Sequence, residues 1–131
     1  MMTDTQNGRL RVMIVSLPGI MQNVLNETFI GRPGMVVVGT ASGCLSAVGI
    51  IHRVFPDLVV IDSSVPEPES HELIRLLKQE NPFIRSLLLV ETTQQLTRAM
   101  QAGADLALTS YSLPESLDRV LGSSGGLKGS G

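Results

Sequence analysis

Residues 56–66 have the sequence PDLVVIDSSVP. Four consecutive apolar residues, 58–61, are followed by an acid, Asp62, and then by small and turn-forming residues. An uninterrupted run of Leu, Val and Ile is typical of a strand that is buried on both faces, as in a parallel sheet. In open α/β sheets the functional site lies at the carboxyl ends of such strands. We therefore predict a buried central strand with Asp62 as a candidate site residue at its end.

Four further apolar runs, at residues 10–15, 35–38, 87–90 and 106–108, predict four more strands. Helical patterns fill the intervals; in the first, Met21, Val24, Leu25 and Phe29 share one face, and residues 31–33 end the helix. A fifth helix is predicted from Ser112, where Glu115 completes a capping box. Strict alternation of strands and helices predicts an α/β domain: a flavodoxin-like five-stranded parallel sheet, order 2-1-3-4-5, with helices on both faces.

The ends of the chain differ in composition from its middle. Residues 1–8 are polar and predict a disordered start, whereas residues 9–121 carry the alternating pattern of one domain. Residues 122–131 include five Gly and three Ser, which predicts a flexible tail or linker.

The composition restricts the class of protein. Charged residues make up 17% of the chain, against about 25% in an average domain. A net charge of −2 argues against direct nucleic-acid binding by this domain. The lone Cys44 excludes an intramolecular disulfide and suits a reducing compartment. No apolar run reaches the roughly 18 residues of a membrane span. We expect a cytoplasmic domain without a membrane contact.

The predicted winding brings the residues after several strands to one edge of the sheet. These residues are Ser16 and Leu17 after the first strand, Asp62 to Ser64 after the third, Val90 and Glu91 after the fourth, and Ser110 after the fifth. We expect them to form one site.

Four stretches resemble a known family. They are RLRVMIV (9–15), MVVVGTASG (35–43), PDLVVIDSSVPEPESHELIRLLK (56–78) and AMQAGADLALTSYSLPESL (99–117). Their spacing resembles the receiver domain of bacterial two-component response regulators, and is most similar to the branch with a C-terminal helix-turn-helix output domain. The resemblance covers residues 9 to about 121.

The resemblance implies a phosphoryl-transfer site. A family receiver takes a phosphoryl group from a histidine kinase on the aspartate at the position of Asp62. Mg²⁺ neutralises the charge on the phosphoryl group and is held by carboxylates together with phosphate oxygens and waters. Two acids after the first strand, a hydroxyl after the fourth and a lysine after the fifth complete the family's site.

This sequence keeps the phosphoacceptor position and lacks its helpers. The acid pair is replaced by Ser16 and Leu17, the hydroxyl by Val90 followed by Glu91, the lysine by Ser110, and the aromatic switch residue by Ala107. The interval from residue 90 to 110 is also about two residues shorter than the family's, which predicts a short or irregular fourth helix. We therefore expect no catalytic residue, no cofactor and no metal, with Mg²⁺ bound weakly at Asp62 only if phosphorylation is retained.

Two arrangements of Asp62 remain open. It is either buried beside Leu17 and Val90 without a counter-charge, or held by hydrogen bonds from Ser16, Ser64 or loop amides. Glu91 or Glu67 could supply a second carboxylate near it.

Three functions follow from these observations. The first is an atypical receiver that works by protein contact, as a homodimer through the face of the fourth helix, fifth strand and fifth helix, where Gln94, Gln95, Thr97 and Gln101 carry no charge. The second is a working receiver that a histidine kinase phosphorylates on Asp62. The third is a small-ligand-binding domain that uses an apolar pocket at Leu17, Asp62 and Val90.

Overall fold

The computed structural model describes residues 8–110 of the 131-residue chain. Strands and helices alternate along it as β1 (Leu10–Val15), α2 (Ile20–Ile30), β2 (Met35–Ala41), α3 (Cys44–Val54), β3 (Leu58–Ile61), α4 (Glu67–Glu80), β4 (Arg85–Val90), α5 (Thr93–Ala102) and β5 (Leu106–Thr109). The predicted disordered start (except Gly8), the fifth helix from Ser112 and the Gly/Ser tail lie outside the described residues, so the predicted domain boundaries stay predictions.

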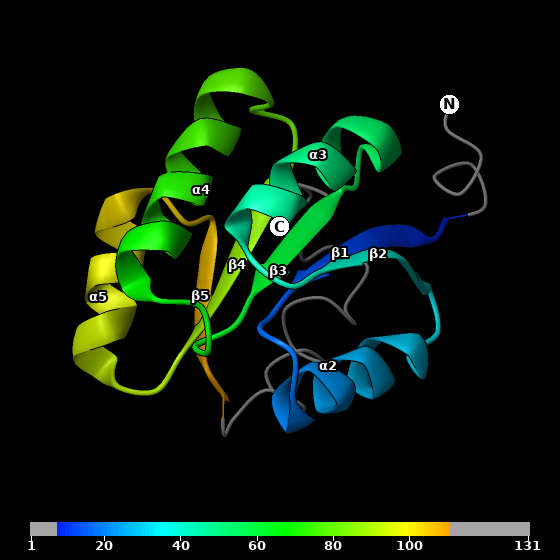
Figure 1. Ribbon diagram of the computed structural model, residues 1–131, viewed down its shortest axis with the longest axis horizontal. Helices are drawn as coiled ribbons and strands as arrows, with labels where there is room; N and C mark the ends of the chain where they lie inside the picture. The colour runs from blue at the N-terminus through cyan, green and yellow to red at the C-terminus, as the bar shows by residue number, and fades with distance from the viewer. Residues whose placement is uncertain (1–7, 111–131) are drawn as a thin grey trace.

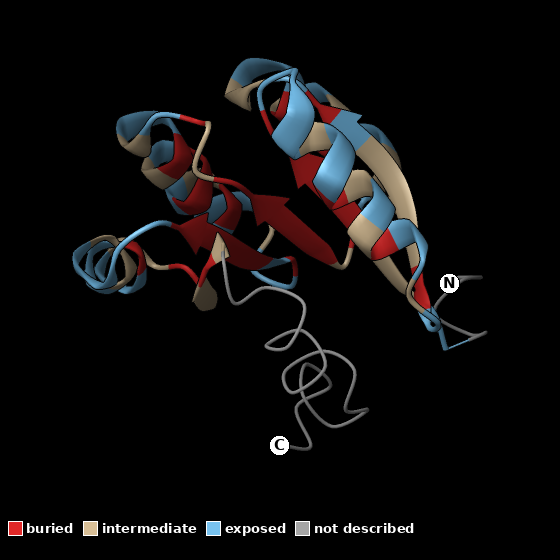
Figure 2. Cartoon of the chain, turned by 90° about the horizontal axis from the view of Figure 1, so that it is seen from below, coloured by how far each residue is buried: buried red, intermediate tan, exposed pale blue. Residues whose placement is uncertain are grey.

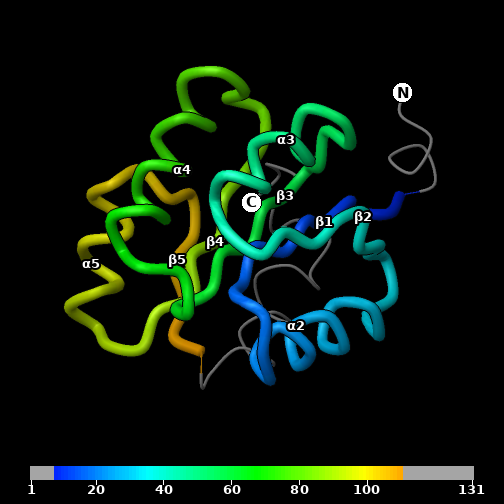
Figure 3. The backbone as a smooth tube through the Cα atoms, in the orientation of Figure 1, coloured from blue at the N-terminus to red at the C-terminus, as the bar shows by residue number. Residues whose placement is uncertain are grey.

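All strand pairings in the sheet are parallel, and the order is β2-β1-β3-β4-β5 (Figure 1). The predicted flavodoxin-like fold is thereby confirmed. The path of the chain in Figure 3 shows how each helix crosses over to return the chain to the start of the next strand. This winding brings the carboxyl ends of the strands to one edge, where Asp62 and Ser16 lie.

Two apolar cores cover the two faces of the sheet. Side chains alternate along each strand, so that Val12 and Ile14 belong to one core while Met13 and Val15 belong to the other. Helix α2 covers the first core, and helices α3, α4 and α5 cover the second (Figure 1). Figure 2 shows the strands as a largely buried layer and the helices with exposed outer sides.

Helix α2 departs from the predicted packing. Its residues Leu25 and Phe29 are fully buried, but Met21 and Val24 are 37% and 47% exposed. A helix turns by about 100° per residue, so Val24 lies roughly 120° around the helix from the midpoint of the buried pair. The sheet therefore contacts a narrower stripe of α2 than the sequence pattern predicts.

Helix α5 has ten residues and regular ends, so of the two predicted outcomes, short or irregular, it is short. The Thr92 hydroxyl accepts a hydrogen bond from the Gln95 amide, and the Gln95 side-chain oxygen accepts one from the Thr92 amide, which forms a capping box. Gly103, with φ of 110°, ends the helix in the left-handed region. Defined caps at both ends give a regular helix in the shorter interval.

Among the helices of residues 8–110, none is long and apolar enough to cross a membrane.

Candidate site at the carboxyl ends of the strands

Asp62 follows β3 directly and is fully buried. Its Oδ2 accepts a 2.6 Å hydrogen bond from the Ser16 hydroxyl. Its Oδ1 accepts from the Ser64 hydroxyl at 2.5 Å and from the Ser64 amide at 2.9 Å. Both carboxyl oxygens therefore have protein donors. Of the two arrangements that the sequence left open, the described hydrogen bonds correspond to the second.

Ser16 is as buried as Asp62, and its backbone is fixed from two directions. Its amide donates to the Ala41 carbonyl at 3.0 Å, which continues the ladder between β1 and β2. Its carbonyl accepts a 2.8 Å hydrogen bond from the Gln22 side chain on α2. Gln22 did not emerge from the sequence, because a glutamine on the polar side of a helix carries no signal of its partner.

Leu17 ties the end of β1 to the loop after β3 through its backbone. Its amide donates to the Ser64 hydroxyl at 2.9 Å, so that this hydroxyl both accepts from Leu17 and donates to Asp62. The Leu17 side chain is 37% exposed. Its contribution to the site is therefore a backbone donor, and its side chain is partly at the surface.

Both acids that could have joined Asp62 have partners elsewhere. Glu91 accepts a 3.1 Å hydrogen bond from the Ser63 hydroxyl. Glu67 pairs with Arg98 at 3.0 Å and lies 3.7 Å from His71. The first contact joins the loops after β3 and β4, and the second joins α4 to α5.

The remaining predicted positions lie on β4, on β5 and directly after β5. Val90 is buried at the end of β4, and the Ser110 hydroxyl donates to its carbonyl at 3.4 Å. Ala107 is partly buried and packs against the core under α3, α4 and α5. These three residues lie at the same edge of the sheet as Asp62 but make no described hydrogen bond to its carboxyl group.

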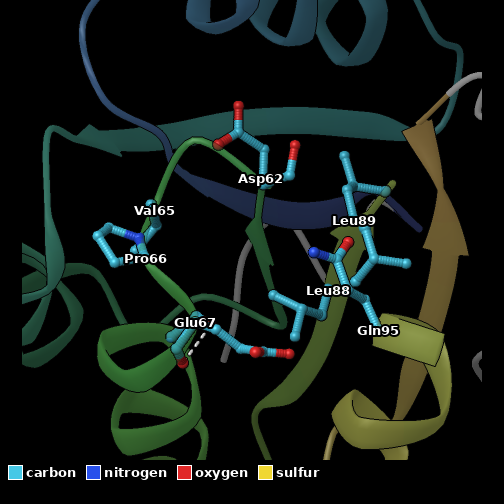
Figure 4. A pocket seen from close by; sticks show the side chains of 10 residues that line it. Asp62, Val65, Pro66, Glu67, Leu88, Leu89 and Gln95 are labelled. Carbon is cyan, nitrogen blue, oxygen red and sulfur yellow. Dashed lines mark hydrogen bonds between the residues drawn. The ribbon is translucent and has the colours of Figure 1, made fainter. Parts of the chain in front are cut away.

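A small cavity of about 80 Å³ lies between the ends of β3 and β4 and the starts of α4 and α5. Asp62 and Val90 are among its lining residues, together with Glu67 and Gln95. Figure 4 shows the Asp62 carboxyl group directed away from Glu67. Leu17 is not among the lining residues of this cavity.

Solved structures with this architecture were compared with the chain. A two-component response regulator of the LuxR family from Aurantimonas sp. superposes with a TM-score of 0.76 at 27% identity, over 87% of this chain and 83% of that chain. The response regulator domain of Thermotoga maritima CheB gives a TM-score of 0.72 at 25% identity, over 85% and 92% of the two chains. The domain is a response-regulator receiver domain. Its predicted identity is thus confirmed.

Curated relatives match the same receiver domain. A protein-glutamate methylesterase/protein-glutamine glutaminase from Halalkalibacterium halodurans is 30% identical over 113 residues, which are 84% of this chain and 33% of the relative. One from Treponema denticola is 31% identical over 80 residues, which are 61% of this chain and 22% of the relative. The chain thus spans a third or less of these relatives' length. No family model matches the chain.

The donor set around Asp62 does not fit the Mg²⁺ site that the receiver family implies. Mg²⁺ takes octahedral oxygen ligands from one or two accessible carboxylates, phosphate and water. Here the single carboxyl group is fully buried, and serine donors engage both of its oxygens. Within residues 8–110, no three His, Cys, Asp or Glu side chains cluster in a way that could hold a metal ion.

Proposed function

We propose that this receiver domain is an atypical one, a signalling module that works by protein contact and does not need phosphorylation or Mg²⁺. The observation that carries the proposal is the state of the Asp62 carboxyl group. An aspartate that attacks a phosphoryl group needs a free oxygen in line with it and cations to offset the charge. In this chain serine hydroxyls and one amide engage both oxygens.

The electrostatics of the neighbouring positions support the same proposal. Where the family resemblance expects two acids and a lysine, the chain has Ser16, Leu17 and Ser110. A phosphoryl dianion at Asp62 would therefore lack a fixed cation. The nearest acids, Glu67 and Glu91, would repel it if they were released from Arg98 and Ser63.

The size of the cavity weighs against the small-ligand alternative. Sites for small molecules usually enclose about 300–1,000 Å³. The cavity beside Asp62 holds about 80 Å³, enough for a few water molecules. We therefore assign the domain a role in protein interaction and do not assign it a cofactor.

The proposal extends to the wider protein. We propose that the domain is not itself an enzyme, that it acts in the cytoplasm, and that its partner is a second copy or another signalling protein. The similarity to a LuxR-family response regulator supports transcription regulation as the class of output. The sequence predicts a homodimer through α5, β5 and the predicted fifth helix. Measuring the oligomeric state of surface variants tests this interface.

A phosphorylation assay tests the central claim. The chain is incubated with acetyl phosphate and Mg²⁺, and intact mass is measured over time beside the Asp62→Asn variant. We expect no phosphoryl adduct on either chain. A quadruple variant, Ser16→Asp, Leu17→Asp, Val90→Thr and Ser110→Lys, restores the family's charges and serves as the control that such an adduct is detectable.

An adduct on the natural chain that is absent from Asp62→Asn would overturn the proposal. It would establish the alternative of a working receiver, for which a histidine kinase is the expected phosphoryl donor.

A further inference from the structure

Helix α2 exposes apolar side chains that its own fold does not cover. Ile20 is 82% exposed and Val24 is 47% exposed, and the adjoining Leu17 and Met21 are each 37% exposed. A helix that packs on a sheet usually turns polar residues outward. Here the outward positions include two β-branched aliphatic residues.

These side chains point away from the sheet, so a segment that packs on the sheet beside α2 cannot cover them. Relative to the midpoint of the buried pair Leu25 and Phe29, Ile20 lies about 160° around the helix and Glu27 about 180°. A segment that packs on the sheet beside α2 contacts only its flanks. What covers Ile20 must therefore approach from outside the domain. We call Ile20, Asn23, Val24 and Glu27 the α2 outer face; Ile30, 64% exposed, lies beyond it at the carboxyl end of the helix.

The two ends of the α2 outer face carry charges of opposite sign. Glu27 is the only charged residue in the whole helix. The amino end of the helix is open: Gly19 provides no side-chain cap, and the first turn holds no acid. A helix amino terminus of this kind carries a partial positive charge that attracts carboxylates.

Two α2 helices that pack antiparallel would bring the exposed aliphatic side chains together and place each Glu27 near an uncapped helix amino end. If two copies cross between Asn23 and Val24, Glu27 of each copy lies opposite Ile20 at the amino end of the other helix. A two-fold axis repeats this contact twice. The aliphatic side chains then pack at the centre, and each carboxylate offsets an uncapped helix end. No like charges oppose each other.

We infer that the α2 outer face is a homodimer interface, in which two copies pack α2 antiparallel with Glu27 against the partner helix's amino terminus. The inference rests on the proposed function and names the partner as a second copy of this chain. It moves self-contact away from α5, whose exposed residues Thr93, Gln94 and Thr97 are polar and whose one exposed large apolar residue is Met100, at 45%. Gln22, on the same helix but outside this face, donates to the Ser16 carbonyl, and the Ser16 hydroxyl donates to Asp62, so two hydrogen bonds connect α2 to Asp62.

The expected affinity is modest. An exposed apolar patch of a few hundred Å² is typical of interaction sites on a monomer surface. Interfaces that bury less than about 1,200 Å² in total belong to weak, transient pairs. We expect a monomer–dimer equilibrium that is visible at tens to hundreds of micromolar chain.

Sedimentation equilibrium of the full 131-residue chain tests the inference with three variants. Ile20→Asp removes the most exposed apolar side chain of the face and places an acid opposite the partner's Glu27, in the first turn of α2, where an acid favours the helix itself. We expect it to weaken association at least tenfold. Glu27→Gln removes the helix-end contact on both sides of the dimer and should weaken association about three- to thirtyfold, the size of two such interactions. Leu45→Asp makes the matching change in the first turn of α3, where Leu45 is 91% exposed, and should leave association unchanged.

Three results would each overturn the inference. A chain that stays monomeric at hundreds of micromolar has no such interface. Equal weakening by Leu45→Asp would mean that the effect is not specific to α2. A large loss of thermal stability in Ile20→Asp would mean that the face is covered within the same chain and not by a second copy.

These outcomes differ from failure of the proposed function. A monomer that takes no phosphoryl group rejects only the interface, whereas an adduct on Asp62 rejects the proposed function whether or not the chain dimerises.

Discussion

The Ser16 hydroxyl donates a 2.6 Å hydrogen bond to the Asp62 carboxyl group, and both residues are completely buried. Ser64 holds the other carboxyl oxygen. In a site built for phosphoryl transfer, the aspartate would face water, metal and substrate. Here it joins the ends of β1 and β3, so we expect removing it to affect the stability of the fold.

Asp62→Ala should lower the free energy of unfolding by about 2–4 kcal/mol. The substitution leaves the buried Ser16 hydroxyl and the partly buried Ser64 hydroxyl without their acceptor, and an unsatisfied buried group costs about 1–3 kcal/mol. Urea unfolding monitored by circular dichroism measures the change. Asp62→Asn, which keeps one acceptor for the Ser64 amide, should cost less. An Asp62→Ala variant as stable as the natural chain would show that this network does not stabilise the fold.

Much of this site could be predicted from the sequence. Uninterrupted apolar runs fix five parallel strands, and parallel strands deliver Ser16, Asp62 and Ser64 to the same edge. Short hydroxyl side chains beside a buried acid have few other partners, so the hydrogen bonds to Asp62 were within reach of sequence reasoning. The exposure of Leu17 was not, because it depends on how the loop after β1 turns once Ser64 has bound its amide.

Helix α2 shows what the sequence pattern does not predict. The pattern of Met21, Val24, Leu25 and Phe29 predicts one apolar face, but the sheet contacts only the stripe through Leu25 and Phe29. A sequence period locates apolar residues around a helix without specifying which neighbour covers them. The capping box of α5, in contrast, can be predicted from the sequence, because Thr92 is followed by Gln95 at the third position of the helix.

The Cys44 thiol should react slowly in the folded chain. Burial, and secondly the negative charge of Glu69, raise the pKa of Cys44 above its ordinary value of 9.0. The thiol also donates to the Glu69 carbonyl at 3.3 Å. Since the thiolate is the nucleophile, alkylation by iodoacetamide at pH 8.5 should be slower in the native chain than in urea. Glu69→Gln should speed it modestly, and equal native and denatured rates would contradict this account.

The same raised pKa sets a dependence of stability on pH. The folded chain holds the Cys44 proton more tightly than the unfolded chain does. This group therefore contributes its full stabilisation below pH 9.0, and the contribution is lost as pH rises through the folded pKa. The urea midpoint should fall above pH 9 more steeply in the natural chain than in Cys44→Ser. Parallel curves for the two chains would refute the linkage.

Thr92→Ala should destabilise the domain by about 1 kcal/mol, because it removes the N-cap of α5. The Thr92 hydroxyl accepts from the Gln95 amide at 3.1 Å. For a domain of this size the loss corresponds to a drop in Tm of about 3–5 °C, measurable by calorimetry. Thr93→Ala changes the neighbouring exposed threonine, which is not the cap, and should shift Tm far less. Equal shifts would mean that the capping bond is not the cause.

Two glycine-to-alanine substitutions should change stability in opposite directions. Gly49 lies inside α3 with open space around it, so Gly49→Ala should raise the free energy of unfolding by about 0.5–1 kcal/mol through helix propensity. Gly103 ends α5 with φ of 110°, where an added Cβ would lie 3.3 Å from Lys78 Cε. Gly103→Ala should therefore lower stability by about 1 kcal/mol or more, since alanine disfavours this backbone conformation.

Urea midpoints of the two glycine variants and of their double mutant provide the check. The two sites lie on different helices, so the changes should add within about 0.5 kcal/mol. Stabilisation by Gly103→Ala would mean that the left-handed end of α5 is not required. Lys78 on α4 forms an ion pair with Asp105 at 3.6 Å, directly before β5. In that case the turn at residues 103–105 would be able to move away from Lys78.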